Sequence, residues 1–353
     1  MIFEWQRNIW QGLVERSDRL PHALLFTGPA GSGKTQFAQT FAARILCETP
    51  DSEGFACGKC QACGWRKSGN HPDFLLITPE SAQAIEEVET ENGEGGLAKG
   101  KKRSDQIRIE QIRALASLLN VGAHRQGYRV VIIQPAEAMN TSTANALLKL
   151  LEEPPSSTLF ILITNSYHNL LPTVLSRCQA VRFPKPDEER ALRWLETEGI
   201  KNADLLLAFA GGMPLAAASL ASGGAAQHFA HFLSGLQTSS ATNALRLAAQ
   251  WESWLRESKD ESAKTTDQID MPGLITWLQK WVFDLLMVKL MGTPKFFPGM
   301  KNELKALCDH ASISALFACY NDIQRARAVA RHPLNPRLLL EDLALRYARA
   351  VAG

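Results

Sequence analysis

The segment Gly28-Pro-Ala-Gly-Ser-Gly-Lys34-Thr35 fits the pattern G-x-x-x-x-G-K-[S/T] of a phosphate-binding loop. The apolar run 23–27 precedes it and predicts a buried strand, and the spacing of Phe37 and Phe41 after it predicts a helix. Because a strand, a glycine-rich turn and a helix follow in that order, the segment predicts an α/β fold built on a parallel sheet. A glycine-rich turn that binds nothing is the alternative.

The expected ligand of this loop is ATP or ADP with Mg²⁺. Successive backbone N–H groups and the helix N-terminus would hold the phosphates. The lysine would reach the β- and γ-phosphates, and the threonine hydroxyl would hold Mg²⁺. The residues of this expected nucleotide site are Gly28, Pro29, Ala30, Gly31, Ser32, Gly33, Lys34 and Thr35.

The strand that should supply the hydrolytic carboxylates ends without them. The run Arg129–Ile133 is rich in β-branched residues and is typical of a buried parallel strand. Hydrolysis needs acidic residues near such a strand end to hold Mg²⁺ and to position water, but Gln134 and Pro135 stand there. Glu137 follows. If the strand continued, alternation would turn its side chain to the opposite face, and Pro135 is expected to end the strand in any case, so we do not expect Glu137 to be catalytic. The sequence therefore indicates nucleotide binding without hydrolysis.

Four of the seven cysteines lie close together in the sequence. The core C-x2-C-x2-C can turn three thiolates toward one point, and a fourth cysteine ends the preceding helix, so the set can complete a tetrahedral structural zinc site. A redox C-x-x-C motif is the alternative, but it leaves the third spaced cysteine unexplained. The expected zinc ligands are Cys47, Cys57, Cys60 and Cys63. His71 is expected to shape the turn before the next strand, and the remaining cysteines are expected to be small buried side chains: Cys178, Cys308 and Cys319.

The chain has 353 residues and a formal net charge of +2. Its length predicts about two or three domains, and the balanced charge argues against DNA binding by the chain alone. Strands alternate with helices in the first half, with further strands expected at 74–77 and 159–163, which predicts a doubly wound parallel sheet. The expected domains are an α/β domain at 1–184, with a metal module at 47–63 and a flexible surface insertion at 81–104, a small helical domain at 185–224 and an all-helical domain at 225–353.

We expect no signal peptide, because the first residues lack an apolar core region. The segment Leu205–Ser222 is apolar enough to raise the question of a membrane span, but Gly211–Pro214 interrupts it. Two short buried helices joined by a turn are therefore expected there. We expect a cytoplasmic protein with no membrane partner.

These features together resemble the bacterial clamp-loader subunits of the AAA+ class. The resemblance spans the whole chain and is strongest over residues 20–180. It rests on the phosphate-binding loop, the four cysteines after its helix, and the segments His71-Pro72-Asp73, Asn145–Pro155, Ser176-Arg177-Cys178 and Asn335–Leu343. It implies an AAA+ phosphate-loop domain, a small helical lid and a C-terminal helical collar.

Two departures select a member within that family. Its ATPase subunits, gamma and tau, carry Asp-Glu where this chain has Gln134-Pro135. They also carry an arginine in the lid that senses the γ-phosphate, whereas this chain has no arginine in Gly211–Leu215. Both departures match the family's non-hydrolysing member, which is regarded as the rigid stator of the loader. The resemblance thus implies a subunit of the DNA polymerase III holoenzyme, a nucleotidyltransferase, with little or no ATPase activity of its own.

The resemblance also assigns a role to Arg177. In this family the Ser-Arg-Cys arginine acts as an arginine finger, which reaches the ATP site of the neighbouring subunit, and guanidinium suits that task because it is always charged and binds phosphate as a fork. A structural arginine that caps a helix or pairs with a carboxylate is the alternative.

Either helix cores or subunit contacts would explain the helical spacing of Trp251, Trp254, Trp277 and Trp281.

The implied partners are gamma or tau and delta in a hetero-oligomeric ring, which would act on the sliding clamp and primer-template DNA. Two other functions stay open at this point. One is an active gamma- or tau-like ATPase that uses an unidentified acid. The other is a zinc-containing DNA-binding module that uses the cysteine loop and the basic segment Gly100–Arg103, although a solvated loop is the simpler interpretation of that segment.

Overall fold

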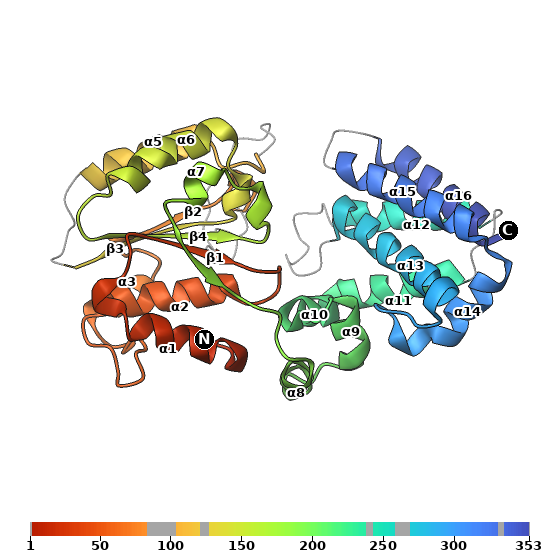
Figure 1. Ribbon diagram of the computed structural model, residues 1–353, viewed down its shortest axis with the longest axis horizontal. Helices are drawn as coiled ribbons and strands as arrows, with labels where there is room; N and C mark the ends of the chain where they lie inside the picture. Colours follow the sequence, from red (N-terminus) through yellow and green to blue (C-terminus); the bar gives the residue numbers. More distant parts are fainter. Residues whose placement is uncertain are drawn as a thin grey trace. The chain divides into compact units, whose positions relative to one another are not determined.

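The strands of the first half of the chain are short runs that form one sheet. Their bounds are β1 (Ala23–Thr27), β2 (Phe74–Ile77), β3 (Arg129–Ile133), β4 (Thr158–Thr164) and β5 (Gln179–Arg182). They lie in the order β2-β3-β4-β1-β5, and every neighbouring pair is parallel (Figure 1). The structure is a computed structural model that describes residues 2–82, 104–120, 127–237, 243–257, 269–330 and 335–352.

The predicted α/β fold with a parallel sheet is confirmed, and four of its strands were expected from their apolar runs. The sequence did not predict β5. Its residues are exposed except for a half-buried Val181, so no apolar run marks it. It pairs with β1, where Leu25 lies beside Ala180. The sheet edge next to the phosphate-binding loop is therefore set by tertiary pairing rather than by local sequence.

Successive strand residues point to opposite faces of the sheet, and helices cover both faces (Figure 1). Leu25 and Val131 pack in one apolar core with α5 and α6, whereas Leu24 and Val130 pack in another with α1 and α2. Residues buried on both sides explain why these strands are continuous apolar runs. The helices are α1 (Arg7–Val14), α2 (Lys34–Leu46), α5 (Ile109–Asn120) and α6 (Thr141–Glu152).

Short helices complete this half of the chain. They are η1 (Glu4–Gln6), η2 (Ser17–Arg19), α3 (Gln61–Lys67), η3 (Ala136–Ala138), η4 (Tyr167–Asn169) and α7 (Pro172–Leu175). Most of the expected insertion 81–104, with its basic end Gly100–Arg103, lies outside the described residues.

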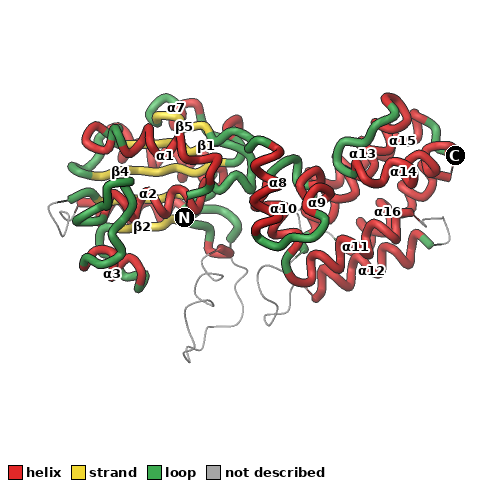
Figure 2. The backbone as a smooth tube through the Cα atoms, turned by 90° about the horizontal axis from the view of Figure 1, so that it is seen from below, coloured by secondary structure: helices red, strands yellow, loops and turns green. Residues whose placement is uncertain are grey.

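The chain divides into two compact units, Met1–Pro186 and Asp187–Gly353. Among the described residues, Figure 2 shows strands only in the first unit. The helices of the second are α8 (Glu188–Thr197), α9 (Ala203–Phe209), α10 (Pro214–Ala221), α11 (Gly223–Gln237), α12 (Ala244–Glu257), α13 (Met271–Met291), η6 (Pro298–Met300), α14 (Lys301–His310), α15 (Ile313–Val329) and α16 (Pro336–Ala352). The expected boundary between residues 224 and 225 falls inside α11, and the separate lid and collar domains stay a prediction.

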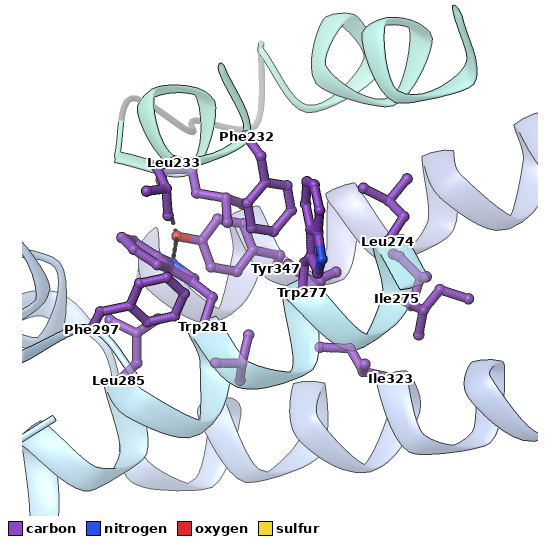
Figure 3. Close-up of a cluster of buried hydrophobic side chains, with 14 of the residues drawn as sticks. Phe232, Leu233, Leu274, Ile275, Trp277, Trp281, Leu285, Phe297, Ile323 and Tyr347 are labelled. Carbon is purple, nitrogen blue, oxygen red and sulfur yellow. Dashed lines mark hydrogen bonds between the residues drawn. The ribbon is translucent and has the colours of Figure 1, made fainter. Parts of the chain in front are cut away.

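The core of the second unit is built around buried aromatic side chains (Figure 3). The Tyr347 hydroxyl accepts a hydrogen bond from Trp281 Nε1 at 2.8 Å and donates one to the Leu236 carbonyl at 3.0 Å. It thereby ties α16 to α13 and α11. The tryptophans whose spacing fitted either a core or a subunit contact belong to this core: Trp251, Trp254, Trp277 and Trp281.

Within the described ranges, no individual helix combines the length and apolar character that crossing a bilayer requires. The apolar stretch Leu205–Ser222 forms α9 and α10, as expected, and the two helices are bent by 117° at their junction. Only as a pair do they match a span in length and composition. Gly211 and Gly212 supply the turn, since both adopt the left-handed backbone conformation that favours glycine.

Candidate nucleotide-binding loop and metal centre

The phosphate-binding loop lies between the end of β1 and the start of α2, in the order that the sequence predicts. Two glycines are required by its geometry. A Cβ on Gly28 would stand 2.3 Å from the Phe183 carbonyl oxygen, so the loop passes directly against the chain after β5. Gly33 caps α2 in the left-handed conformation with φ 87°. The N-terminus of α2 therefore opens toward the loop, which suits an anionic ligand.

Lys34 is folded back into the loop. Its Nζ donates to the carbonyl oxygens of Gly28 at 2.8 Å and Pro29 at 2.7 Å, and it lies 3.4 Å from the Ser32 hydroxyl. The side chain is buried, and this burial lowers the pKa of Lys34 to about 8, opposed by the negative charge of Glu137. The ammonium group thus lies where it could exchange loop carbonyls for phosphate oxygens.

The first two residues after β3, Gln134 and Pro135, carry no carboxylate. Gln134 donates its backbone N–H to the Ile77 carbonyl at 2.9 Å, which continues the pairing with β2, and Pro135 follows. Glu137 lies in η3, so the strand ends before it, as Pro135 indicated. Its Oε1 accepts the Asn165 N–H at 3.1 Å, and its charge raises the pKa of Lys34. The expectation that Glu137 is not catalytic stays a prediction.

A second contact on the loop comes from the start of the chain, and no sequence motif indicated it. Trp5 Nε1 and Gln6 Nε2 both donate to the Ser32 carbonyl oxygen, at 3.2 and 2.9 Å. Gln6 is fully buried. A buried glutamine beside a glycine-rich loop carries no recognisable spacing, so only the folded structure reveals the pair.

The four cysteines come together at one point. Their sulfur atoms all lie within 4.8 Å of one another. The distances from Cys47 Sγ to Cys60 Sγ, from Cys57 Sγ to Cys63 Sγ, and from Cys63 Sγ to Cys47 Sγ are 3.9, 4.0 and 3.7 Å. A tetrahedral zinc with Zn–S bonds of about 2.3 Å needs sulfur atoms about 3.8 Å apart. The cluster fits a metal of that size, and all four cysteines are free of disulfides.

Local structure aims these sulfur atoms inward. Cys47 follows directly after α2. Cys60 caps the N-terminus of α3, and its sulfur accepts the Cys63 N–H. Hydrogen bonds from the Thr49 side chain and from the backbone N–H groups of Lys59 and Cys60 lower the pKa of Cys57 to about 6. Such N–H to sulfur contacts favour the thiolate form that binds a metal.

His71 is not part of the cluster. Its Nδ1 accepts the Asp73 N–H at 3.1 Å, which shapes the turn into β2 as the sequence predicted. Asp73 Oδ1 in turn lies 3.7 Å from Arg129 Nε, and both side chains are buried. This pair fixes the start of β2 to the start of β3.

Arg177 follows α7 at the surface of the first unit. Its Nη2 lies 2.7 Å from Glu152 Oε1, and its Nη1 donates to the Thr173 carbonyl at 3.0 Å and to the Ser176 hydroxyl at 3.2 Å. The side chain is 35% exposed. Arg177 therefore forms the carboxylate pair that a structural arginine would form, and it keeps part of its guanidinium open to solvent.

Comparisons with known proteins agree with one another. The family model described as DNA polymerase III, delta subunit, matches residues 5–187. The DNA polymerase III subunit delta' of Pseudomonas aeruginosa is 32% identical and covers 98% of this chain and 97% of its own length. The subunit delta' of Escherichia coli is 29% identical over 98% of this chain and 94% of its own length. The fold is similar to that of a solved DNA polymerase III gamma subunit-related protein of Thermotoga maritima, with a TM-score of 0.50, 19% identity and coverage of 97% and 99%.

Proposed function

This chain belongs to the DNA polymerase III delta subunit family, and from that membership we propose that it is a delta' subunit of a bacterial clamp loader. The observation that carries the proposal is the combination of a complete phosphate-binding loop with a β3 end that has no carboxylate. A subunit of this kind holds nucleotide without hydrolysing it and serves as a rigid member of the ring.

The residues of the loop fit a nucleoside di- or triphosphate. The loop backbone lies close to the chain after β5 at Gly28, where a Cβ would clash, and α2 presents its N-terminus to the loop. In the proposed site Gly28–Thr35 binds the phosphates, Lys34 neutralises them and the Thr35 hydroxyl holds Mg²⁺. Bound Mg²⁺ would stabilise negative charge on the phosphates. Gln134 offers an uncharged amide where hydrolysis requires a carboxylate, so binding and hydrolysis are separated in this chain.

Arg177 is the residue we assign to hydrolysis in a neighbouring subunit. Its guanidinium is partly exposed. Contacts with Glu152 and with the Thr173 carbonyl hold it in one orientation at the surface. A fixed, charged fork of this type can stabilise the charge that develops on a transferred phosphoryl group. The proposed neighbours are gamma or tau and delta, and the assembled ring acts on the sliding clamp and primer-template DNA.

The proposal extends to the metal site and the domains. Cys47, Cys57, Cys60 and Cys63 bind a structural Zn²⁺, which closes the loop between α2 and α3. Within the second unit, residues 185–224 act as a lid and residues 225–353 as a collar that packs with other subunits. Replication takes place in the bacterial cytoplasm, which is where we place the protein.

One experiment tests the nucleotide and arginine assignments together. ATP turnover is measured for the purified chain and for a loader reconstituted with gamma or tau and delta. We expect no appreciable turnover by the chain alone. In the loader, Arg177→Ala should remove the turnover of the neighbouring site, because an arginine finger contributes about 10³–10⁵ in rate in related NTPases. Arg193→Ala is the control, since Arg193 is an exposed arginine paired with Glu189.

The outcomes separate the alternatives. Unchanged loader turnover in Arg177→Ala contradicts the role of this arginine. Turnover by the isolated chain that is lost in both Lys34→Ala and Glu137→Gln would instead make it an active ATPase, with Glu137 as the acid beside the loop. Tight, salt-sensitive DNA binding by the isolated chain that requires the metal would favour the zinc-containing DNA-binding module.

A further inference from the structure

The short helix η1 packs directly on the phosphate-binding loop. The ring of Phe3 stacks on that of Trp5 with centroids 4.8 Å apart, and both lie at the start of the chain. A Cβ on Gly33 would stand 2.6 Å from Gln6 Nε2 and 2.9 Å from the Phe3 ring. The absence of a side chain at Gly33 is thus what allows η1 to reach the loop.

The contact is made through one peptide group of the loop. The Ser32 carbonyl oxygen accepts hydrogen bonds from Gln6 Nε2 at 2.9 Å and from Trp5 Nε1 at 3.2 Å. The Gln6 amide is itself oriented, because its Oε1 accepts the Phe3 N–H at 3.2 Å. Ser32 and Gln6 are both buried, so the hydrogen bond from Gln6 is shielded from water, whereas the one from Trp5 is partly buried.

This arrangement fixes the direction of a phosphate-binding group. A trans peptide is planar, so the N–H of Gly33 points opposite to the carbonyl of Ser32. With the carbonyl held by Trp5 and Gln6, the Gly33 N–H is turned away from η1. Loops that bind phosphate use successive backbone N–H groups, and a loop already ordered in its binding form loses less entropy on binding.

We propose that Gln6 and Trp5 are positioning residues for the phosphates of a bound nucleoside di- or triphosphate. They act through the Ser32–Gly33 peptide and do not touch the nucleotide themselves. The inference rests on the proposed nucleotide binding by Gly28–Thr35. It makes the first turn of the chain a functional part of the nucleotide site, although it contains no recognised nucleotide-binding motif.

The test is equilibrium binding of ADP and ATP to the full chain and to two variants. Gln6→Met keeps the volume of the side chain and removes its donor. Trp5→Phe keeps an aromatic ring beside Phe3 and removes the indole N–H. Gln11→Met, at an exposed position of the neighbouring α1, is the matched control. We expect each test variant to weaken ADP and ATP binding by about three- to tenfold, the range for one neutral hydrogen bond, and the control to bind as the unaltered chain does.

Thermal midpoints of the same samples distinguish positioning from a structural role. A purely structural role would lower the midpoint and leave the affinity of the folded protein unchanged, which would overturn the proposal. Tighter binding in either variant would also overturn it, because η1 would then obstruct the loop. If the unaltered chain bound neither nucleotide, the proposed nucleotide site itself would fail, whereas binding by the unaltered chain with unchanged variants would refute only the role of Gln6 and Trp5.

Discussion

At the scale of single residues, the buried Lys34 and the half-buried Lys280 illustrate how the chain handles positive charge. Lys34 directs its ammonium group at two loop carbonyls and the Ser32 hydroxyl. An ammonium group has three donors, so these contacts account for all of them. A nucleotide held by Lys34 must therefore take over contacts that the loop already supplies, and the net gain from this lysine is smaller than its charge alone suggests.

Lys280 gives a pH-dependent stability that can be measured. Its Nζ donates to the Phe209 carbonyl at 2.6 Å and lies 4.3 Å from the centre of the Phe209 ring. Burial, together with the positive charge of Arg327, lowers the pKa of Lys280 from 10.5 to about 8. Between these values the unfolded chain binds more protons than the folded one, so this residue adds stability as the pH rises from about 8 toward 10.5.

We therefore expect the unaltered protein to gain free energy of unfolding relative to Lys280→Met when the pH rises from about 7.5 to 9.5. Urea denaturation of both proteins at each pH measures their free energies of unfolding. The difference between the two proteins cancels the contribution of the titrating groups that they share. Lys305→Met, at an exposed position of α14, is the control and should follow the unaltered protein. Parallel profiles for Lys280→Met and the unaltered protein would contradict the prediction.

Residues that act through a local motif were predictable from the sequence, and residues that act through tertiary contact were not. The loop Gly28–Thr35 was predictable because its strand, turn and helix are contiguous in the sequence. The end of β3 before Glu137 was expected from Pro135, but the short helix η3 that carries Glu137, and its contact with the Asn165 N–H, were not. Gln6 and Trp5 contact a loop that lies far along the chain, and their residue types carry no spacing that marks the contact.

At the scale of elements, α2 joins the two candidate sites. It begins at Lys34 in the phosphate-binding loop and ends at Leu46, directly before Cys47. Its 13 residues correspond to about 20 Å of helix. Phe37 and Phe41 bury one side of it against Trp10 and Phe26. The helix thus anchors the four-cysteine segment to the same core that supports the phosphate-binding loop.

The metal assignment predicts about one zinc per chain in purified protein, as elemental analysis would measure. Cys60→Ser should lower zinc affinity by more than the about 10–100-fold that changes outside the ligand set cost, since it removes a ligand itself. Cys178→Ser, which leaves the cluster intact, should retain the metal. Protein that contains no metal while all four cluster thiols are reduced and reactive would refute the site.

The strands show which elements the sequence can define. Four were evident because a strand buried on both faces is a continuous apolar run, as in β3, where every residue is buried. β5 has no such run, and its place follows from pairing with β1. After Pro186, only the two short helices around Gly211–Pro214 were expected individually, because leucine and alanine spacing does not say which of the other helices pair.

At the scale of the whole molecule, the second unit is held together by long-range contacts of Tyr347. Its hydroxyl lies between Trp281 and the Leu236 carbonyl in a fully buried position, and its burial raises the pKa of the phenol. Removing that oxygen leaves a buried indole N–H and a buried carbonyl without this partner. Unsatisfied groups of this kind cost about 1–3 kcal/mol each.

Tyr347→Phe is therefore expected to lower the free energy of unfolding of the second unit by about 1–3 kcal/mol, measured by urea denaturation with tryptophan fluorescence. The matched control is Tyr320→Phe, because the half-buried Tyr320 hydroxyl has only a 3.3 Å contact with Gln279 Nε2. The control should change stability by less than about 0.5 kcal/mol. Equal losses in both variants would show that the buried position of Tyr347 does not matter.

The strand order of the first unit also governs what happens while the chain is being made. β1 is complete at Thr27, yet its sheet neighbours β4 and β5 end only at Thr164 and Arg182. Ribosomes add about 5–20 residues per second, so this strand waits on the order of ten seconds for a partner. During that interval Ala23–Thr27 is an unpaired apolar segment, so the strand that later supports the phosphate-binding loop is exposed to association with other chains until its neighbours are made.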